Sequence, residues 1–145
     1  MPPKNDPAKA KKEKQPKPLE QLVQDVGLYP ADAFEFIQHG LSYTVQQIHA
    51  SLTDPKASRH VSGQQLCEGL RDFALVQWGY LARTVLRRWN ITATLDFGRI
   101  VFALVEAGHM QKTDDDTLED FKNVYDFRHA FESRYRIKVA ALPAT

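Results

Sequence analysis

Three helix-like segments follow one another within residues 60–108 with little chain between them, and this stretch most constrains the fold. The first segment opens with Ser62 three residues before Gln65, which is the spacing of a capping box, and it ends at Gly79. The third segment, residues 94–108, is apolar on nearly every side, which predicts a buried central helix. A chain with this centre is expected to be mainly α-helical.

The first segment carries an apolar stripe at helical spacing, which predicts its buried face. The stripe consists of Leu66, Leu70, Phe73 and Ala74. Cys67 lies beside these residues and is the only cysteine in the chain, so a buried thiol is favoured over a disulfide or a nucleophile. In the third segment Thr94 is the expected N-cap, and Asp96 stands where the helix dipole favours an anion.

Two further helices are expected before residue 60. A short apolar stripe from Leu19 to Val26 ends at Gly27, and a longer stripe with intervals of three and four residues runs from about Ala31 to Leu52. The apolar spacing after residue 127 suits one more helix. The sequence therefore predicts a compact bundle of about five to six helices.

Residues 109–127 leave two alternatives open. Thr117 followed by Asp120 matches a capping box and favours a helix, whereas residues 124–127 have strand propensity. A small β-hairpin here would make the order of the central segments resemble a winged helix. The third helix would then offer only Arg99 to DNA and the wing would be acidic, so a protein partner is favoured even for that shape.

Charge is distributed unevenly along the chain, although the net charge is only +1. Residues 1–17 hold six lysines, two acidic residues and four prolines, a charge of +4, while the remaining residues hold 13 basic and 16 acidic side chains, a charge of −3. Apart from Met1, the first 17 residues have no side chain larger than alanine that could anchor a core. We therefore expect residues 1–17 to form a disordered basic tail and residues 18–145 to form a single helical domain.

Nine basic side chains are candidates for binding a polyanion such as nucleic acid or the ribosome. Lysines that bind phosphates release counterions, so the tail would give a weak, salt-dependent affinity for nucleic acid without recognition of bases. The alternative is that the tail only keeps the protein in solution. The second central segment adds an amphipathic helix with a basic face. The candidates are Lys4, Lys9, Lys11, Lys12, Lys14 and Lys17 in the tail and Arg83, Arg87 and Arg88 in the helix.

Several residues that suggest chemistry have a simpler structural interpretation. Residues 96–98 spell the Asp-Phe-Gly of protein kinases, but no glycine-rich loop accompanies them. The acidic run 114–120 lacks the alternation and central glycine of a calcium loop. His39 and His49 are ten residues apart and do not share a helix face, while His60 has no recognisable nucleophile nearby and suits a loop anchor. No catalytic, cofactor-binding or metal-binding residue is predicted.

The expected function follows from these observations. No apolar run reaches the roughly 18 residues that a membrane span needs, and the N-terminus lacks the apolar region of a signal peptide, so a cytoplasmic protein is expected. The leading hypothesis is a non-enzymatic protein-interaction or adaptor module that binds a protein partner. A nucleic-acid-associated or ribosome-associated protein is the alternative, and an enzyme built around His60 and Asp96 comes third.

Four strings in the chain resemble motifs of an uncharacterised bacterial family of short proteins restricted to Planctomycetes and Verrucomicrobia. They are HVSGQQLCEGLRDFAL, LARTVLRRW, DFGRIVFALVEAG and EDFKNVYDF. The resemblance covers about Leu19 to Ile137 and leaves out the lysine tail. It implies no activity, ligand or catalytic residue. Arg99 stands where this family leads us to expect an acidic residue, so no carboxylate-based role is carried over to that position.

Overall fold

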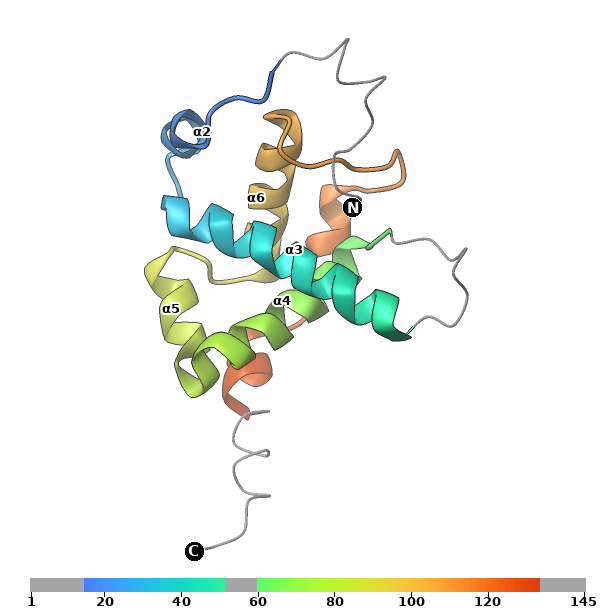
Figure 1. Cartoon of the computed structure of the whole chain (residues 1–145). Coiled ribbons are helices and arrows are strands. Elements are labelled where there is room, and N and C mark those ends of the chain that lie inside the picture. Colours follow the sequence, from blue (N-terminus) through green and yellow to red (C-terminus); the bar gives the residue numbers. More distant parts are fainter. Residues whose placement is uncertain (1–14, 52–59, 134–145) are drawn as a thin grey trace, which may run out of the picture.

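The computed structural model describes residues 15–51 and 60–133 of the chain (Figure 1). Within these ranges the chain forms five α-helices and no β-strand, which confirms the predicted mainly α-helical fold. The helices are α2 (Leu19–Val26), α3 (Ala31–Ser51), α4 (Gly63–Trp78), α5 (Ala82–Arg88) and α6 (Thr94–Glu106). Shorter elements are the 3-10 turns η1 (Gly79–Leu81) and η2 (Leu118–Phe121) and the π-helical turn η3 (Arg128–Ser133).

Local capping fixes several helix ends where the sequence predicts them. The Ser62 hydroxyl accepts a hydrogen bond from the Gln65 amide (3.1 Å), and the Gln65 side chain accepts one from the Ser62 amide (3.0 Å). Gly27 follows α2 with φ of 69°, a left-handed conformation that glycine adopts without steric cost. The predicted end of the long stripe at Leu52 and the predicted tail residues 1–14 lie outside the described residues.

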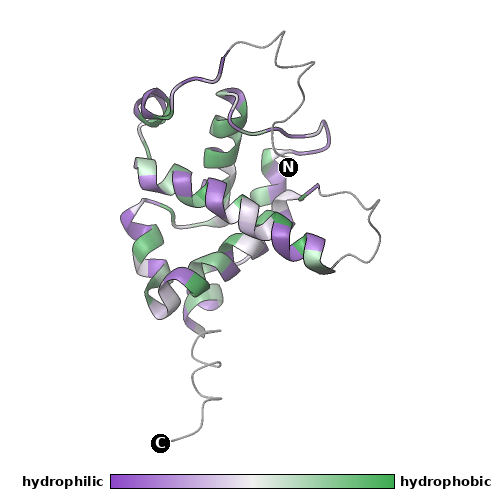
Figure 2. Cartoon of the chain, in the orientation of Figure 1, coloured by the Kyte–Doolittle hydropathy of each residue, from purple (hydrophilic) through white to green (hydrophobic). Residues whose placement is uncertain are grey.

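Helix α6 is the centre of the core, as its apolar sequence predicts. It crosses behind α3 in Figure 1 and contacts α2, α3, α4 and η2. Figure 2 shows it as a largely hydrophobic helix. Its most buried apolar side chains are Phe97, Ile100, Val101 and Leu104, all with no solvent exposure.

Helices α3 and α4 approach closely because each carries a glycine at their contact. A Cβ atom on Gly40 would collide with the Leu70 side chain, and one on Gly69 would collide with the Thr44 side chain. The Thr44 hydroxyl is buried and donates a hydrogen bond to the Gly40 carbonyl (2.7 Å). The glycines therefore set the spacing of this helix pair.

Of the two alternatives for residues 109–127, the β-hairpin is wrong, because this described segment contains no strand, and the winged-helix comparison that depends on the hairpin is wrong with it. Acidic side chains in this region bind nearby backbone instead: Asp116 accepts from the Thr113 amide (2.8 Å) and Asp120 accepts from the Thr117 amide (3.0 Å). Such local bonds compete with a strand ladder. The capping box at Thr117, the other alternative, forms only in part: the Asp120 carboxylate accepts from the Thr117 amide, but the Thr117 side chain makes no cap hydrogen bond, and the segment is the short 3-10 turn η2.

Turn η2 inserts Phe121 against the starts of α4 and α6. The ring is fully buried, and Cβ atoms on Gly63 or Gly98 would meet it. The Thr94 hydroxyl donates to the Phe121 carbonyl (2.6 Å), so Thr94 is not the N-cap that its position predicts. The N-cap of α6 is Ala93, whose amide donates to the Asp96 carboxylate (3.2 Å).

Candidate functional site

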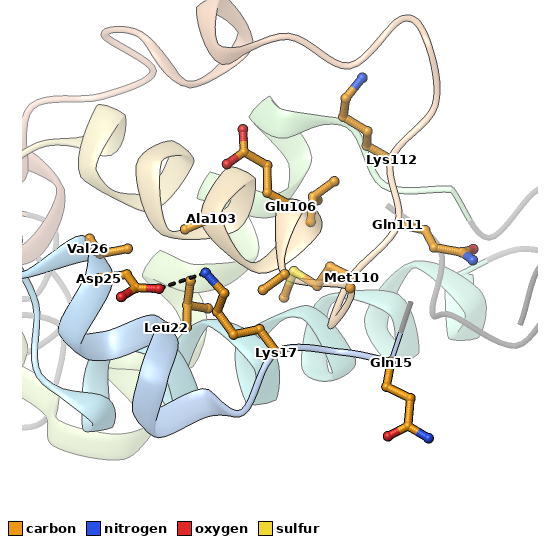
Figure 3. Close-up of a pocket in the computed structure, with 13 residues that line it drawn as sticks. Gln15, Lys17, Leu22, Asp25, Val26, Ala103, Glu106, Met110, Gln111 and Lys112 are labelled. Carbon is orange, nitrogen blue, oxygen red and sulfur yellow. Dashed lines mark hydrogen bonds and ion pairs between the residues drawn. The ribbon is translucent and has the colours of Figure 1, made fainter. Parts of the chain in front are cut away.

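An open groove of about 840 Å³ lies between α2 and the C-terminal end of α6 (Figure 3). We call it the α2–α6 groove. This volume is in the range of small-molecule and peptide-binding clefts. Apolar side chains line it, some buried and some only half-buried: Leu22, Val26, Ala103, Val105 and Met110.

Charged side chains of both signs surround this apolar lining. Lys17 forms an ion pair with Asp25 (2.7 Å), and hydrogen bonds from Lys17 and then from Gln21 lower the pKa of Asp25. Glu106 and Lys112 lie on the opposite side of the groove, on α6 and on the segment after it (Figure 3). The groove therefore has an apolar floor and a charged rim.

The backbone of Lys17 is held at one edge of the α2–α6 groove by two hydrogen bonds. The Lys17 amide donates to the Ala107 carbonyl (2.9 Å), and His109 Nε2 donates to the Lys17 carbonyl (2.5 Å). Lys17, one of the nine polyanion candidates, thus belongs to the folded surface. The other tail candidates, Lys4, Lys9, Lys11, Lys12 and Lys14, lie outside the described residues.

The three candidate arginines of α5 do not behave alike. Arg83 is half-buried and forms an ion pair with Glu132 (2.6 Å) on η3, a partner 49 residues away. Arg87 and Arg88 are exposed at the end of α5 and form no ion pair within the described part of the chain. Only these two present free guanidinium groups on that helix.

A second, smaller cavity of about 230 Å³ lies where α3, α4 and the end of α5 meet, and we call it the aromatic notch. Phe36 is buried at its base, with ring centroids 5.3 Å from Trp78, 5.8 Å from Trp89 and 5.6 Å from Phe73. The two tryptophans contact each other edge to face at 5.3 Å. Phe73, predicted as part of the buried stripe of α4, is instead partly exposed because it lines this notch.

Two carboxylates stand beside these rings at the start of α3. Asp32 and Glu35 are exposed, line the aromatic notch, and form no ion pair or side-chain hydrogen bond within the described residues. His39, one turn further along α3, completes this side. The sequence did not reveal the notch, because its rings occupy positions that fit the apolar stripes of their helices.

His60 and Asp96, the two residues of the enzyme hypothesis, pair with different groups. His60 Nε2 lies 3.3 Å from Asp116, which suits the predicted anchoring role. Asp96 instead accepts from the Tyr29 hydroxyl (2.5 Å) and from Arg99 (3.2 Å). Burial, and next the hydrogen bond to Asp96, raise the pKa of Tyr29 to about 12. The Asp-Phe-Gly triplet is thus part of a helix start.

Among the described residues, the acidic run and the Cys67 thiol are the other groups that could carry metal or thiol chemistry. Within residues 15–51 and 60–133, no three His, Cys, Asp or Glu side chains gather in a way that could hold a metal ion. In the acidic run, Asp116 and Asp120 bind backbone amides of their own segment. Burial raises the pKa of the Cys67 thiol, and the side chain has no solvent exposure, as predicted.

Comparisons of the chain with protein families, with curated proteins and with solved structures found no match. Among the described helices, none is both long and apolar enough to cross a membrane.

Proposed function

We propose that this chain is a protein-interaction module and that the α2–α6 groove is its docking site. One observation carries the proposal: half-buried apolar side chains, among them Val26 and Val105, lie within a rim of Lys17, Asp25 and Glu106. An apolar centre within a polar rim is the usual anatomy of a protein interface. The occupant would be an apolar segment of a partner protein.

The lysine-rich residues 1–14 would add a second, weaker attraction. They join the folded part at Gln15, which itself lines the groove. Lys14 directly precedes Gln15 in the sequence, and residues 1–14 carry five lysines in all, which would attract an acidic partner. Acidic residues flanking the partner's apolar segment would therefore raise its association rate, and added salt would lower it.

A nucleic-acid-associated protein is the alternative, because Arg87 and Arg88 are exposed together at the end of α5. Arg83 weakens this alternative, since its guanidinium is already paired with Glu132. Each phosphate contact adds about one unit to the slope of the logarithm of the binding constant against the logarithm of the salt concentration. A basic face of only two arginines can make few such contacts, so the slope would be small.

A capture experiment tests the groove. The chain carrying Val26→Lys, which puts a charge on the groove floor, should lose its protein partner from a nuclease-treated extract of the native cell. Val45→Lys is the matched control, because Val45 is also half-buried in a helix but lines neither the groove nor the notch. Thermal unfolding checks that both variants fold. Equal capture by the two variants would contradict docking in the groove.

A salt titration of duplex and single-stranded nucleic-acid binding separates the two functions. It compares the full chain, a chain lacking residues 1–14, and the triple variant Arg83→Glu, Arg87→Glu and Arg88→Glu. An interaction module should bind weakly, lose that binding with the tail, and keep most of it in the triple variant. Submicromolar binding at physiological salt that survives removal of the tail and disappears in the triple variant would establish the alternative.

A further inference from the structure

We propose that the aromatic notch is a second recognition site, which takes the arginine side chain of a partner peptide. The notch lies on α3, α4 and the end of α5, whereas the docking groove of the proposed function lies on α2 and α6. The two sites share no lining residue, so neither proposal depends on the other.

The rings provide a surface suited to a cation. Phe36, Trp78 and Trp89 are in mutual contact, with centroids 5.3 to 5.8 Å apart, so no ligand fits between them. Phe36 is buried, so a ligand in the notch can reach only the half-buried rings of Trp78, Trp89 and Phe73. Guanidinium groups are favoured there, because a tryptophan face attracts a cation and a planar guanidinium stacks on it.

The carboxylates give this surface its charge preference. Asp32 and Glu35 are three residues apart in α3, so they lie on the same side of the helix, next to the rings. Neither has a cationic partner within the described residues, which leaves two negative charges at the mouth of an aromatic cavity. Carboxylate oxygens match the fork of donors on a guanidinium group, and the Gln77 side chain supplies a further acceptor.

The size of the notch decides what kind of ligand can enter. About 230 Å³ is too little for a helix or a folded partner, but it accommodates one long side chain. The notch is open to solvent, so the backbone that carries this side chain would stay outside. An arginine in an extended segment or a loop of the partner fits these limits, with the methylene groups of its stem over the apolar rings.

Tryptophan fluorescence of the full chain tests the proposal directly, because Trp78 and Trp89 are the only two tryptophans and both line the notch. The probe is an uncharged-end tripeptide, acetyl-Gly-Arg-Gly-amide. The same peptide with citrulline is isosteric but neutral, and one with lysine carries a point charge. The arginine peptide should change the emission saturably and bind at least about tenfold more tightly than the citrulline peptide.

Charge-neutralising variants locate the effect. Asp32→Asn with Glu35→Gln should weaken arginine-peptide binding about tenfold, because both carboxylate charges are lost while the rings remain. Asp114→Asn with Asp115→Asn is the matched control, since it removes two charges from an exposed loop outside the notch. Val26→Lys, the groove variant, should leave the binding unchanged.

Four outcomes would overturn the proposal. They are the absence of a saturable change, equal binding of the citrulline peptide, equal binding of the lysine peptide, and equal weakening by the Asp32/Glu35 and Asp114/Asp115 variants. The last would mean that overall charge, and not the notch, determines the affinity.

Discussion

Replacing Asp96 by alanine should strongly destabilise the fold, because this buried carboxylate accepts hydrogen bonds from Tyr29, Thr92 and Ala93. The change would leave the buried Tyr29 hydroxyl without its acceptor, which costs about 1–3 kcal/mol. Loss of the bonds from the Thr92 and Ala93 amides adds about 1 kcal/mol, as for other helix caps. The half-exposed Arg99 pair adds little. We expect a decrease of about 2–4 kcal/mol in the free energy of unfolding.

A double-mutant cycle with Tyr29→Phe isolates the contact between α6 and the turn before α3. Tyr29→Phe alone should cost about 1–2 kcal/mol, and Asp96→Ala should cost about 1–2 kcal/mol less in that background than in the wild type. The assay is urea unfolding followed by circular dichroism at pH 7, with the exposed Asp115→Ala as a control near zero. A coupling energy of zero, or a cost below about 1 kcal/mol for Asp96→Ala, would refute the reasoning.

The same contact makes stability depend on pH in the alkaline range. The pKa of Tyr29 is about 12 in the folded chain against a usual value of 10.0. Below pH 10 the hydroxyl is neutral in both states, so its contribution is fully present. Between about pH 10 and 12 only the unfolded chain ionises, so stability falls as pH rises. The fall should be smaller in Tyr29→Phe, and an identical pH profile would contradict the assignment.

Three further predictions concern packing. Gly69→Ala should lower the free energy of unfolding by about 1–3 kcal/mol, because the added Cβ atom would collide with the Thr44 side chain. The loss should be smaller in a Thr44→Ala background. An equal loss in both backgrounds would contradict the role of Gly69 at the α3–α4 contact. Phe121→Ala should lower the free energy of unfolding by about 3–5 kcal/mol, whereas Leu118→Ala, at an exposed position, should lower it by less than about 1 kcal/mol. Similar losses for the two variants in a denaturant titration would contradict the burial of Phe121. The Cys67 thiol should react with Ellman's reagent only after denaturation, so rapid reaction of the native chain would show that it is accessible.

The sequence by itself determined the features that depend on near neighbours. The capping box of Ser62 and Gln65 joins residues three apart, and Gly27 ends its helix through its own backbone conformation. The burial of α6 was predictable too, since a helix that is apolar on nearly all sides has no face to present to water. Each of these features depends on residues within one helical turn or one helix, so the spacing of residues in the sequence predicts it.

Only the tertiary structure decided the features whose partners lie far along the chain. Thr94 bonds Phe121, 27 residues away, and so does not cap its own helix; Tyr29 bonds Asp96 across 67 residues. The helix periodicity marks Phe73 as apolar but does not distinguish a core position from the wall of the aromatic notch. That distinction depends on how closely α3 and α4 approach at their glycines and on where the end of α5 comes to lie, and this packing is set by shape complementarity between distant segments.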